Sequence, residues 1–598
     1  MIANKTTVGD RPPLVEARWY RFFHVGVIAS MPFAEVAINR TLFVTPAGNG
    51  SIDSWLYTGC FLSLPDYLHR YHDTYYLTRL SWLLPGFIVH RLFAPLTAND
   101  VLHFTFFYAL LAATYCLVST GINRSAAILV TLIVGWNPAI LLSLSWDYVD
   151  GAGIVFLVVT LLCLEHAARP KGHTSMWAAG AGASFACMVC ANLFLVTLAP
   201  ALALFLLLRT GSSRWRDVLR RLLPTAAGTV AVLVFFGGAN RWLGGAWLFL
   251  VPSFRSAREL LSGPNPWKAP GYGWIFRSTW LVLPAMASVG AVLALRCWRG
   301  IGSFERALQL TLLSALAWWI VLQLGPMNPF QIPYYVSYVS ALSLLALPLQ
   351  ALTINRGVSP RVAVLLELGT FTFFAFAHGT IFAPGNTFWT TAYAWLNRSI
   401  GVVHPVESPM GASFATISAS CVGLAAVLSL RSSARFSTRW VLFVAGLTVA
   451  SAAMWPFWPR PVWSPAAAID ARAEFEEVVF THRFIDRNIV GRPVRFWYDL
   501  PSDSTAPFRA ISSTYLWQYA LLNEQMPNLT KQEAALLKSD TRLVLLVPTV
   551  ERAEIARPVL RTFGFDFSIV THRQFGKNDF PFVVVIADVH VIGSLKRE

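Results

Sequence analysis

The sequence predicts a polytopic α-helical membrane protein with about 13 transmembrane helices and a C-terminal extracytoplasmic α/β domain. Apolar residues make up 55% of the 598 residues and charged residues only 13%, against roughly 45–50% and 25% in soluble domains. Mean hydropathy is +0.52, and apolar runs long enough to cross a bilayer recur along residues 1–458. Residues 459–598 instead alternate short strand-like and helix-like patterns. This composition excludes a disordered chain, a fibrous protein and an ordinary cytosolic enzyme.

A helix needs about 20 apolar residues to span the hydrocarbon layer, and this length selects the candidate crossings. The region 175–208 fits either one long helix or two short ones, and we take it as two. The predicted crossings are 22–44, 101–120, 125–143, 152–165, 175–191, 193–208, 222–238, 279–295, 308–325, 335–352, 362–383, 412–430 and 440–456.

The distribution of charge predicts the orientation of these helices. Residues 1–458 carry 30 of the 47 basic residues and 15 of the 31 acidic ones, while the remaining chain is almost neutral. With a cytoplasmic N-terminus, 20 of those 30 basic residues fall in short cytoplasmic segments, as the positive-inside rule requires. The excess charge is therefore an orientation signal, and no nucleic-acid partner is expected. We expect a multi-pass protein of the cell (inner) membrane, with the lipid bilayer as a partner and the C-terminus outside.

Residues 79–95 are apolar, but counting them as a crossing would place the later arginine clusters outside. We therefore expect an amphipathic helix at the outer interface there. The transmembrane domain, residues 1–458, then has four notable outer loops: 45–100, 144–151, 239–278 and 384–411.

The C-terminal domain, residues 459–598, follows a proline-rich junction that ends at Pro465. Alternating strands and helices suggest a small sheet covered by helices. The expected strands are 493–499, 541–548, 567–573 and 580–590, and the expected helices are 512–525 and 550–564.

Acidic residues are scarce in the apolar part, so the position of each one is informative. Asp53 lies just beyond the first predicted helix, and Asp147 and Asp150 lie in the second outer loop. Asp53 could simply cap a helix, and so could one of the other two, although capping does not readily explain both of them. Alternatively, a carboxylate at the membrane boundary is a candidate catalytic residue, and at low dielectric Asp53 suits a general base. The three together could also hold a hard divalent cation, and the sequence indicates no other cofactor.

Basic residues in the outer loops run against the orientation rule and so call for an explanation. Arg79 precedes the predicted interfacial helix, and Arg255 and Arg258 lie in the third outer loop. Anionic lipid head groups would account for them. A specific phosphate or pyrophosphate would do so too, because the guanidinium fork matches phosphate oxygens.

This layout resembles the GT-C superfamily of integral-membrane glycosyltransferases. In that superfamily an aspartate follows the first helix, outer juxtamembrane helices come next, and a second acidic motif sits in the next short outer loop. Asp53, with Trp55 and Tyr57, matches the first motif. The segment YYLTRLSWLLPG (75–86) is similar to the juxtamembrane segment of the protein mannosyltransferase (dolichyl-phosphate-mannose) and aminoarabinose transferase branch, and SWDYVDG (145–151) occupies the second acidic position.

Two departures separate this chain from that branch. Ser54 follows Asp53, where the protein mannosyltransferases have an Asp-Glu pair. Arg79, Leu80 and Ser81 stand in place of a Lys-Pro-Pro sequence.

The resemblance implies an inverting sugar transfer at the outer membrane face. The donor would be a polyprenyl-phosphate sugar and the acceptor a glycan, a lipid or a protein. Asp53 would be the general base, and Arg79, with Arg255 or Arg258, would stabilise the leaving phosphate. Asp147 or Asp150 would orient a substrate or help to hold a metal.

Two other classes remain open. A transporter or flippase of a lipid-linked sugar would also have many helices and a positive outer surface, but such folds often carry internal repeats and charged residues in mid-helix. Here the acidic residues gather at outer helix ends instead, and no half-to-half repeat is evident. A scaffolding subunit whose loop carboxylates are inert is the third option.

Overall fold

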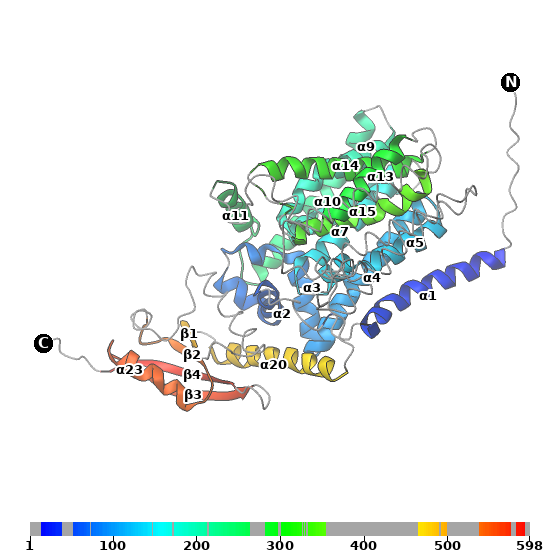
Figure 1. The fold of residues 1–598 in the computed structure, drawn as a ribbon. Coiled ribbons are helices and arrows are strands. Elements are labelled where there is room, and N and C mark those ends of the chain that lie inside the picture. The colour runs from blue at the N-terminus through cyan, green and yellow to red at the C-terminus, as the bar shows by residue number, and fades with distance from the viewer. Residues whose placement is uncertain are drawn as a thin grey trace, which may run out of the picture.

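A computed structural model provides the structure of the chain, and it shows a helical bundle joined to a small C-terminal sheet (Figure 1). The structure describes residues 14–38, 43, 52–71, 73–145, 147–169, 173–211, 215–262, 281–296, 301–325, 327, 329–330, 333–354, 465–489, 492–498, 537–575 and 582–592. The predicted crossings 362–383, 412–430 and 440–456, the loop 384–411 and the helix 512–525 lie outside the described residues.

Six helical segments in the described part are long and apolar enough to cross a membrane. They are α4 (Pro95–Gly121), α7 (Val149–Ala168), α8 (Thr174–Ala191), the 3-10 helix η2 (Leu193–Leu198) continued by α9 (Ala199–Thr210), α10 (Trp215–Trp242) and α14 (Ser303–Leu324). Shorter apolar stretches lie in α1 (Leu14–Ile38), α5 (Arg124–Gly135), α13 (Val282–Arg296) and α15 (Pro333–Ile354). The chain is a multi-pass membrane protein, while the count of 13 crossings and their orientation stay predictions.

One predicted crossing differs in detail from the helices observed, and one open choice between one helix and two is decided. The segment 125–143 is broken, since α5 ends at Gly135 and α6 (Pro138–Leu144) begins anew at a proline that cannot donate a backbone hydrogen bond. The region 175–208 is two helices, as predicted. They are separated at Asn192, whose side chain accepts a hydrogen bond from the backbone N–H of Phe194.

The segment predicted as the first outer loop contains three short helices: α2 (Ile52–Arg70), the 3-10 helix η1 (Tyr75–Thr78) and α3 (Leu80–Leu92). As predicted, α3 is too short to span. Its first half is enclosed, since Leu80 to Leu84 are all buried, while Ile88 and Leu92 in the second half are exposed on one face. Helix α3 packs between α2, α4 and α8. The placement of this helix at the outer interface stays a prediction.

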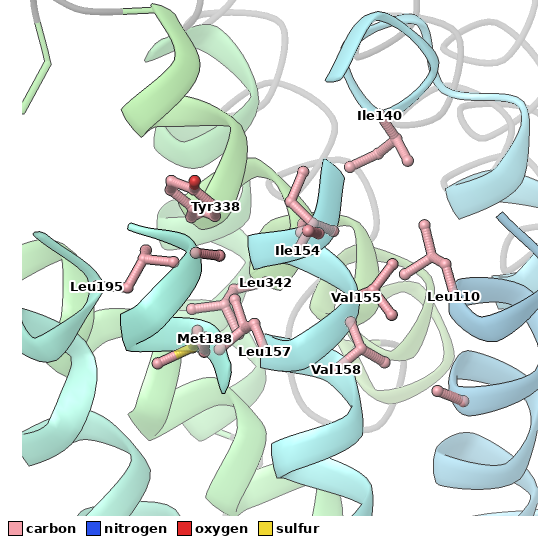
Figure 2. Close-up of a cluster of buried hydrophobic side chains, with 14 of the residues drawn as sticks. Leu110, Ile140, Ile154, Val155, Leu157, Val158, Met188, Leu195, Tyr338 and Leu342 are labelled. Atoms are coloured by element: carbon pink, nitrogen blue, oxygen red, sulfur yellow. The ribbon is translucent and has the colours of Figure 1, made fainter. Parts of the chain in front are cut away.

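Helix α7 forms the centre of the bundle and is apolar on all sides. Figure 2 shows its side chains surrounded by residues from five neighbouring elements. The labelled residues of α7 are Ile154, Val155, Leu157 and Val158; around them lie Leu110 of α4, Ile140 of α6, Met188 of α8, Leu195 of η2, and Tyr338 and Leu342 of α15. The first turn of α7, which carries Asp150, is therefore held firmly in position.

The backbones of α8 and α10 pack closely against each other at two glycines, Gly182 and Gly228. A Cβ atom added to Gly182 would lie 1.7 Å from the carbonyl oxygen of Thr225, and one on Gly228 would lie 2.0 Å from that of Ala179. Backbones this close are typical of small-residue interfaces between membrane helices.

Four strands make up the C-terminal sheet: β1 (Val494–Tyr498), β2 (Arg542–Val547), β3 (Phe565–Phe575) and β4 (Phe582–Val591). Their order is β1-β2-β4-β3, with β1 parallel to β2 and the other pairs antiparallel. The four predicted strands are confirmed. The predicted helix 550–564 is present as the 3-10 helix η6 (Glu551–Ile555) followed by α23 (Ala556–Arg561).

A further helix, α20 (Pro465–Ile489), was not predicted, because the prolines before it were read as a junction. It covers the face of the sheet formed by Val544 and Leu546, while α23 packs on the opposite face. On its other side α20 meets α2 and α4, and the partly buried Leu62 and Leu96 join its apolar cluster. The sheet is thus attached to the bundle through α20 (Figure 1).

Candidate functional site

Arg79 lies where α2, η1, α3 and the start of α7 meet, and four tyrosines surround its guanidinium group. The guanidinium carbon lies 5.2 Å from the ring centroid of Tyr75 and 5.5 Å from each of the other three ring centroids, a cation–π arrangement. We call these four residues the tyrosine cage: Tyr57, Tyr75, Tyr76 and Tyr148.

The Arg79 side chain is buried, with 8% of its surface exposed, and it donates a hydrogen bond to the hydroxyl of Tyr57. Among the side chains that the structure describes, no carboxylate lies within 4.0 Å of it. Burying a cation is costly unless an anion or several hydrogen bonds compensate for the lost water. A guanidinium has five N–H donors, so the cage can present Arg79 to an anion with planar or tetrahedral oxygens.

Asp147 lies beside this cage, and both of its oxygens are engaged. Thr58 donates to Oδ2 at 2.5 Å, and Nε2 of His103 lies 2.9 Å from Oδ1. The other ring nitrogen of His103, Nδ1, lies 2.6 Å from the backbone oxygen of Leu144. These contacts join α2, α4 and the segment that leads into α7.

The geometry limits how protons are shared in this group. Nδ1 of His103 faces a carbonyl oxygen, which only accepts, so that nitrogen carries a hydrogen. Nε2 faces a carboxylate oxygen, so one further proton is shared between Nε2 and Oδ1. His103 and Asp147 are only 2% and 1% exposed, so the pair is sheltered from water. The arrangement suits a carboxylate that holds three elements in register rather than one that removes a proton from a substrate.

Asp150 lies in the first turn of α7, where the helix dipole favours a negative charge. It is buried, and the hydroxyl of Tyr338, from α15, donates to its Oδ1 at 3.1 Å. Asp147 and Asp150 are thus near in sequence but bind different partners: His103 and Thr58 for the first, Tyr338 for the second.

The other two predicted phosphate ligands lie on a different helix from Arg79. Arg255 and Arg258 are exposed on α11 (Val251–Ser262). Nη1 of Arg255 lies 4.0 Å from Oδ1 of the exposed Asp73. Helix α11 nevertheless touches the segment next to Arg79, since the hydroxyls of Ser253 and Thr78 are 2.5 Å apart.

Asp53 belongs to the first turn of α2, one turn before Tyr57 of the cage. Its side chain lies outside the described part, so its role as a base stays a prediction. Within the described residues, no three His, Cys, Asp or Glu side chains form a group that could hold a metal ion.

Sequence reasoning did not assign His103, Thr58 or the paired tyrosines of the cage to the site. One signal was present: His103 is an ionisable residue inside an apolar spanning helix, and such residues usually have a functional or pairing role. Tyr75 and Tyr76 precede Arg79 in the quoted YYLTR segment, but only the fold brings Tyr57 and Tyr148 to the same guanidinium.

Comparison with known proteins identifies the fold. No protein-family model and no curated protein sequence matches the chain. Among solved structures, ArnT from Cupriavidus metallidurans bound to undecaprenyl phosphate superposes with a TM-score of 0.50 at 11% identity, over 95% of this chain and 98% of that one. An archaeal oligosaccharyltransferase, from Archaeoglobus fulgidus and tethered with an acceptor peptide, gives 0.40 at 13% identity, over 92% and 70%.

At these identities the likeness concerns the fold, and the weaker match carries no weight. The chain therefore shares its fold with ArnT over almost the whole length of both proteins, and the predicted resemblance is confirmed at the level of the fold.

Proposed function

We propose that the protein is a membrane glycosyltransferase that moves a sugar from a polyprenyl-phosphate donor to an acceptor at the outer membrane face. The observation that carries the proposal is the buried Arg79 in its tyrosine cage. A buried cation with remaining N–H donors is suited to a phosphate group, because desolvation strengthens the attraction between them. The likeness in fold to ArnT, which was solved with undecaprenyl phosphate bound, supports this choice of ligand.

The proposed reaction inverts the anomeric carbon. Asp53 takes the proton of the acceptor hydroxyl as its oxygen attacks that carbon, and the bond from the carbon to the phosphate oxygen breaks. The lipid phosphate leaves with the electron pair of that bond, and Arg79 stabilises its negative charge.

The other predicted residues take supporting roles in this scheme. Asp147, through Thr58, and Asp150, through Tyr338, hold α2, α7 and α15 around the substrates. Arg255 and Arg258, exposed on α11, attract the anionic head group from the membrane surface before it reaches Arg79.

The test uses purified protein in lipid, a panel of radiolabelled polyprenyl-phosphate sugars and a crude membrane fraction as acceptor. We expect label to move to the acceptor with the wild type and not with Asp53→Asn. Arg79→Ala should lower kcat/KM by about a hundredfold or more, the typical effect of removing a donor to the developing charge.

Arg91→Ala is the matched control, because Arg91 lies at the exposed end of the same helix α3, with its guanidinium carbon 5.2 Å from the ring centroid of Phe87. It should leave transfer unchanged. If no donor supports transfer and labelled lipid instead crosses proteoliposome membranes, the protein is a transporter and the proposal is wrong.

A further inference from the structure

Helix α2 contains a kink between the residues that face the site and the rest of the helix. Ser63 has non-helical dihedral angles (φ −142°, ψ 45°), and Pro65 follows inside the same helix. A proline removes one backbone donor and clashes with the preceding turn, so a kink at this place is expected. Before the kink lie Tyr57 of the cage and Thr58, the donor to Asp147.

The kink is bound by two side chains of α20, from the C-terminal part of the chain. Ser63 donates its hydroxyl hydrogen to Oδ2 of Asp486 at 3.0 Å. The same oxygen lies 3.2 Å from Nδ1 of His482, and Nε2 of His482 lies 3.3 Å from the hydroxyl of Tyr67. A neutral imidazole with its hydrogen on Nδ1 satisfies all of these contacts, since it donates to Asp486 and accepts from Tyr67. The two α20 residues thus hold α2 at the kink, through Ser63, and one turn after it, through Tyr67.

His482 also packs against the backbone next to the site. A Cβ atom added to Gly59 would lie 3.0 Å from Nε2 of His482 and 2.5 Å from the hydroxyl oxygen of Tyr67. Only glycine leaves room for both side chains here. Gly59 directly follows Thr58, so α20 touches α2 one residue from the donor to Asp147.

We propose that α20 is a positioning element: through His482 and Asp486 it fixes the kink of α2, and so the placement of Tyr57 and Thr58 beside Arg79 and Asp147. The catalytic consequence rests on the proposed function; the structural consequence does not. In this scheme the C-terminal part of the chain controls the geometry of the site without touching the substrates.

Because Ser63 and His482 both contact the same oxygen of Asp486, two substitutions at this residue can test whether that oxygen fixes the kink. Asp486→Ala removes the acceptor of both Ser63 and His482. Asp486→Asn keeps a carbonyl oxygen that can occupy the place of Oδ2 and accept both bonds. The matched control is Arg472→Ala, because Arg472 also lies on α20 but pairs with Asp100 of α4, at 3.7 Å, and not with α2.

The first readout is independent of catalysis and uses Cys60, which is fully buried in α2. Its rate of modification by a maleimide in the full-length protein, measured by mass spectrometry, reports opening of α2 and is compared between the wild type and each variant. We expect Asp486→Ala to raise this rate about tenfold, which corresponds to about 1.4 kcal/mol, and Asp486→Asn and Arg472→Ala to leave it near the wild-type value.

The second readout is the transfer assay above. Asp486→Ala should lower kcat about tenfold with little change in the KM for the lipid donor, because Arg79 itself is not moved out of the cage. Asp486→Asn should restore kcat.

Equal Cys60 modification in wild type and Asp486→Ala would overturn the proposal, whatever the activity. A loss of activity in Arg472→Ala as large as in Asp486→Ala would also overturn the proposal. Such a result would show that activity depends on any contact of α20 with the helical bundle and not on the contact at the kink of α2. Transfer absent from the wild type would instead refute the proposed function, and faster modification of Cys60 in Asp486→Ala would still support positioning by α20.

Discussion

The buried pair formed by Asp147 and His103 allows a prediction that separates a structural carboxylate from a catalytic one. Substituting alanine for Asp147 removes both acceptor oxygens and leaves His103 and Thr58 facing each other without the carboxylate. Breaking a buried ion pair in this way typically costs about 3–5 kcal/mol, because the remaining charged or polar group stays desolvated.

Substituting asparagine for Asp147 should cost much less, and the geometry gives the reason. The amide oxygen can accept from Thr58, and the amide nitrogen can donate to Nε2 of a neutral His103 whose Nδ1 hydrogen still reaches the backbone oxygen of Leu144. Every hydrogen bond is kept and only the charge is lost. We expect a cost of about 1–2 kcal/mol, in the range of one hydrogen bond to a charged group.

The assay is thermal inactivation of the full-length protein in one detergent, with tryptophan fluorescence as the probe. Asp147→Ala should lower the midpoint clearly more than Asp147→Asn does, and combining His103→Leu with Asp147→Ala should cost less than the sum of the two single changes. Asp147→Asn should also retain measurable sugar transfer. Equal destabilisation by alanine and asparagine would refute the hydrogen-bond assignment, and complete loss of transfer in a stable Asp147→Asn protein would make Asp147 the base.

Two further predictions concern stability alone. Gly182→Ala should destabilise the bundle by about 1–3 kcal/mol, because the added Cβ would lie 1.7 Å from the carbonyl oxygen of Thr225. Gly180→Ala, on the same helix, is the control: its added Cβ would lie 3.4 Å from the Cys163 sulfur, an ordinary contact, so the midpoint in the same thermal assay should not change. In the sheet, two hydrogen bonds from Arg542 hold the pKa of the Asp588 carboxyl below its usual value, so Asp588 contributes stability above about pH 4 that is lost as the pH falls through its folded pKa. Hydrogen exchange of β2 and β4 in the full chain should accelerate in acid more for the wild type than for Asp588→Asn, and identical pH dependence in both proteins would contradict this.

Much of the fold follows from local patterns that the sequence carries directly. Spanning helices need only length and apolar composition, because a bilayer offers no partner for backbone groups and the helix satisfies its own hydrogen bonds. Strands such as β2 and β4 are indicated by runs of aliphatic, largely β-branched residues bounded by turns. Helix α20 is not predicted from the sequence, because the prolines before it suggest a spacer. Its charged, half-exposed pattern also does not indicate which element the helix packs against.

The candidate site shows the same division between local and long-range information. The sequence by itself determined that Asp53, Arg79, Asp147 and Asp150 lie at helix ends outside the longest apolar runs. Only the tertiary structure decided that Arg79 sits among tyrosines from three separate segments, and that Asp147 is paired with a histidine 44 positions away. The physical reason is that hydropathy is a property of neighbouring residues, whereas the environment of a buried charge depends on which helices pack together, and that is fixed by contacts across the whole bundle.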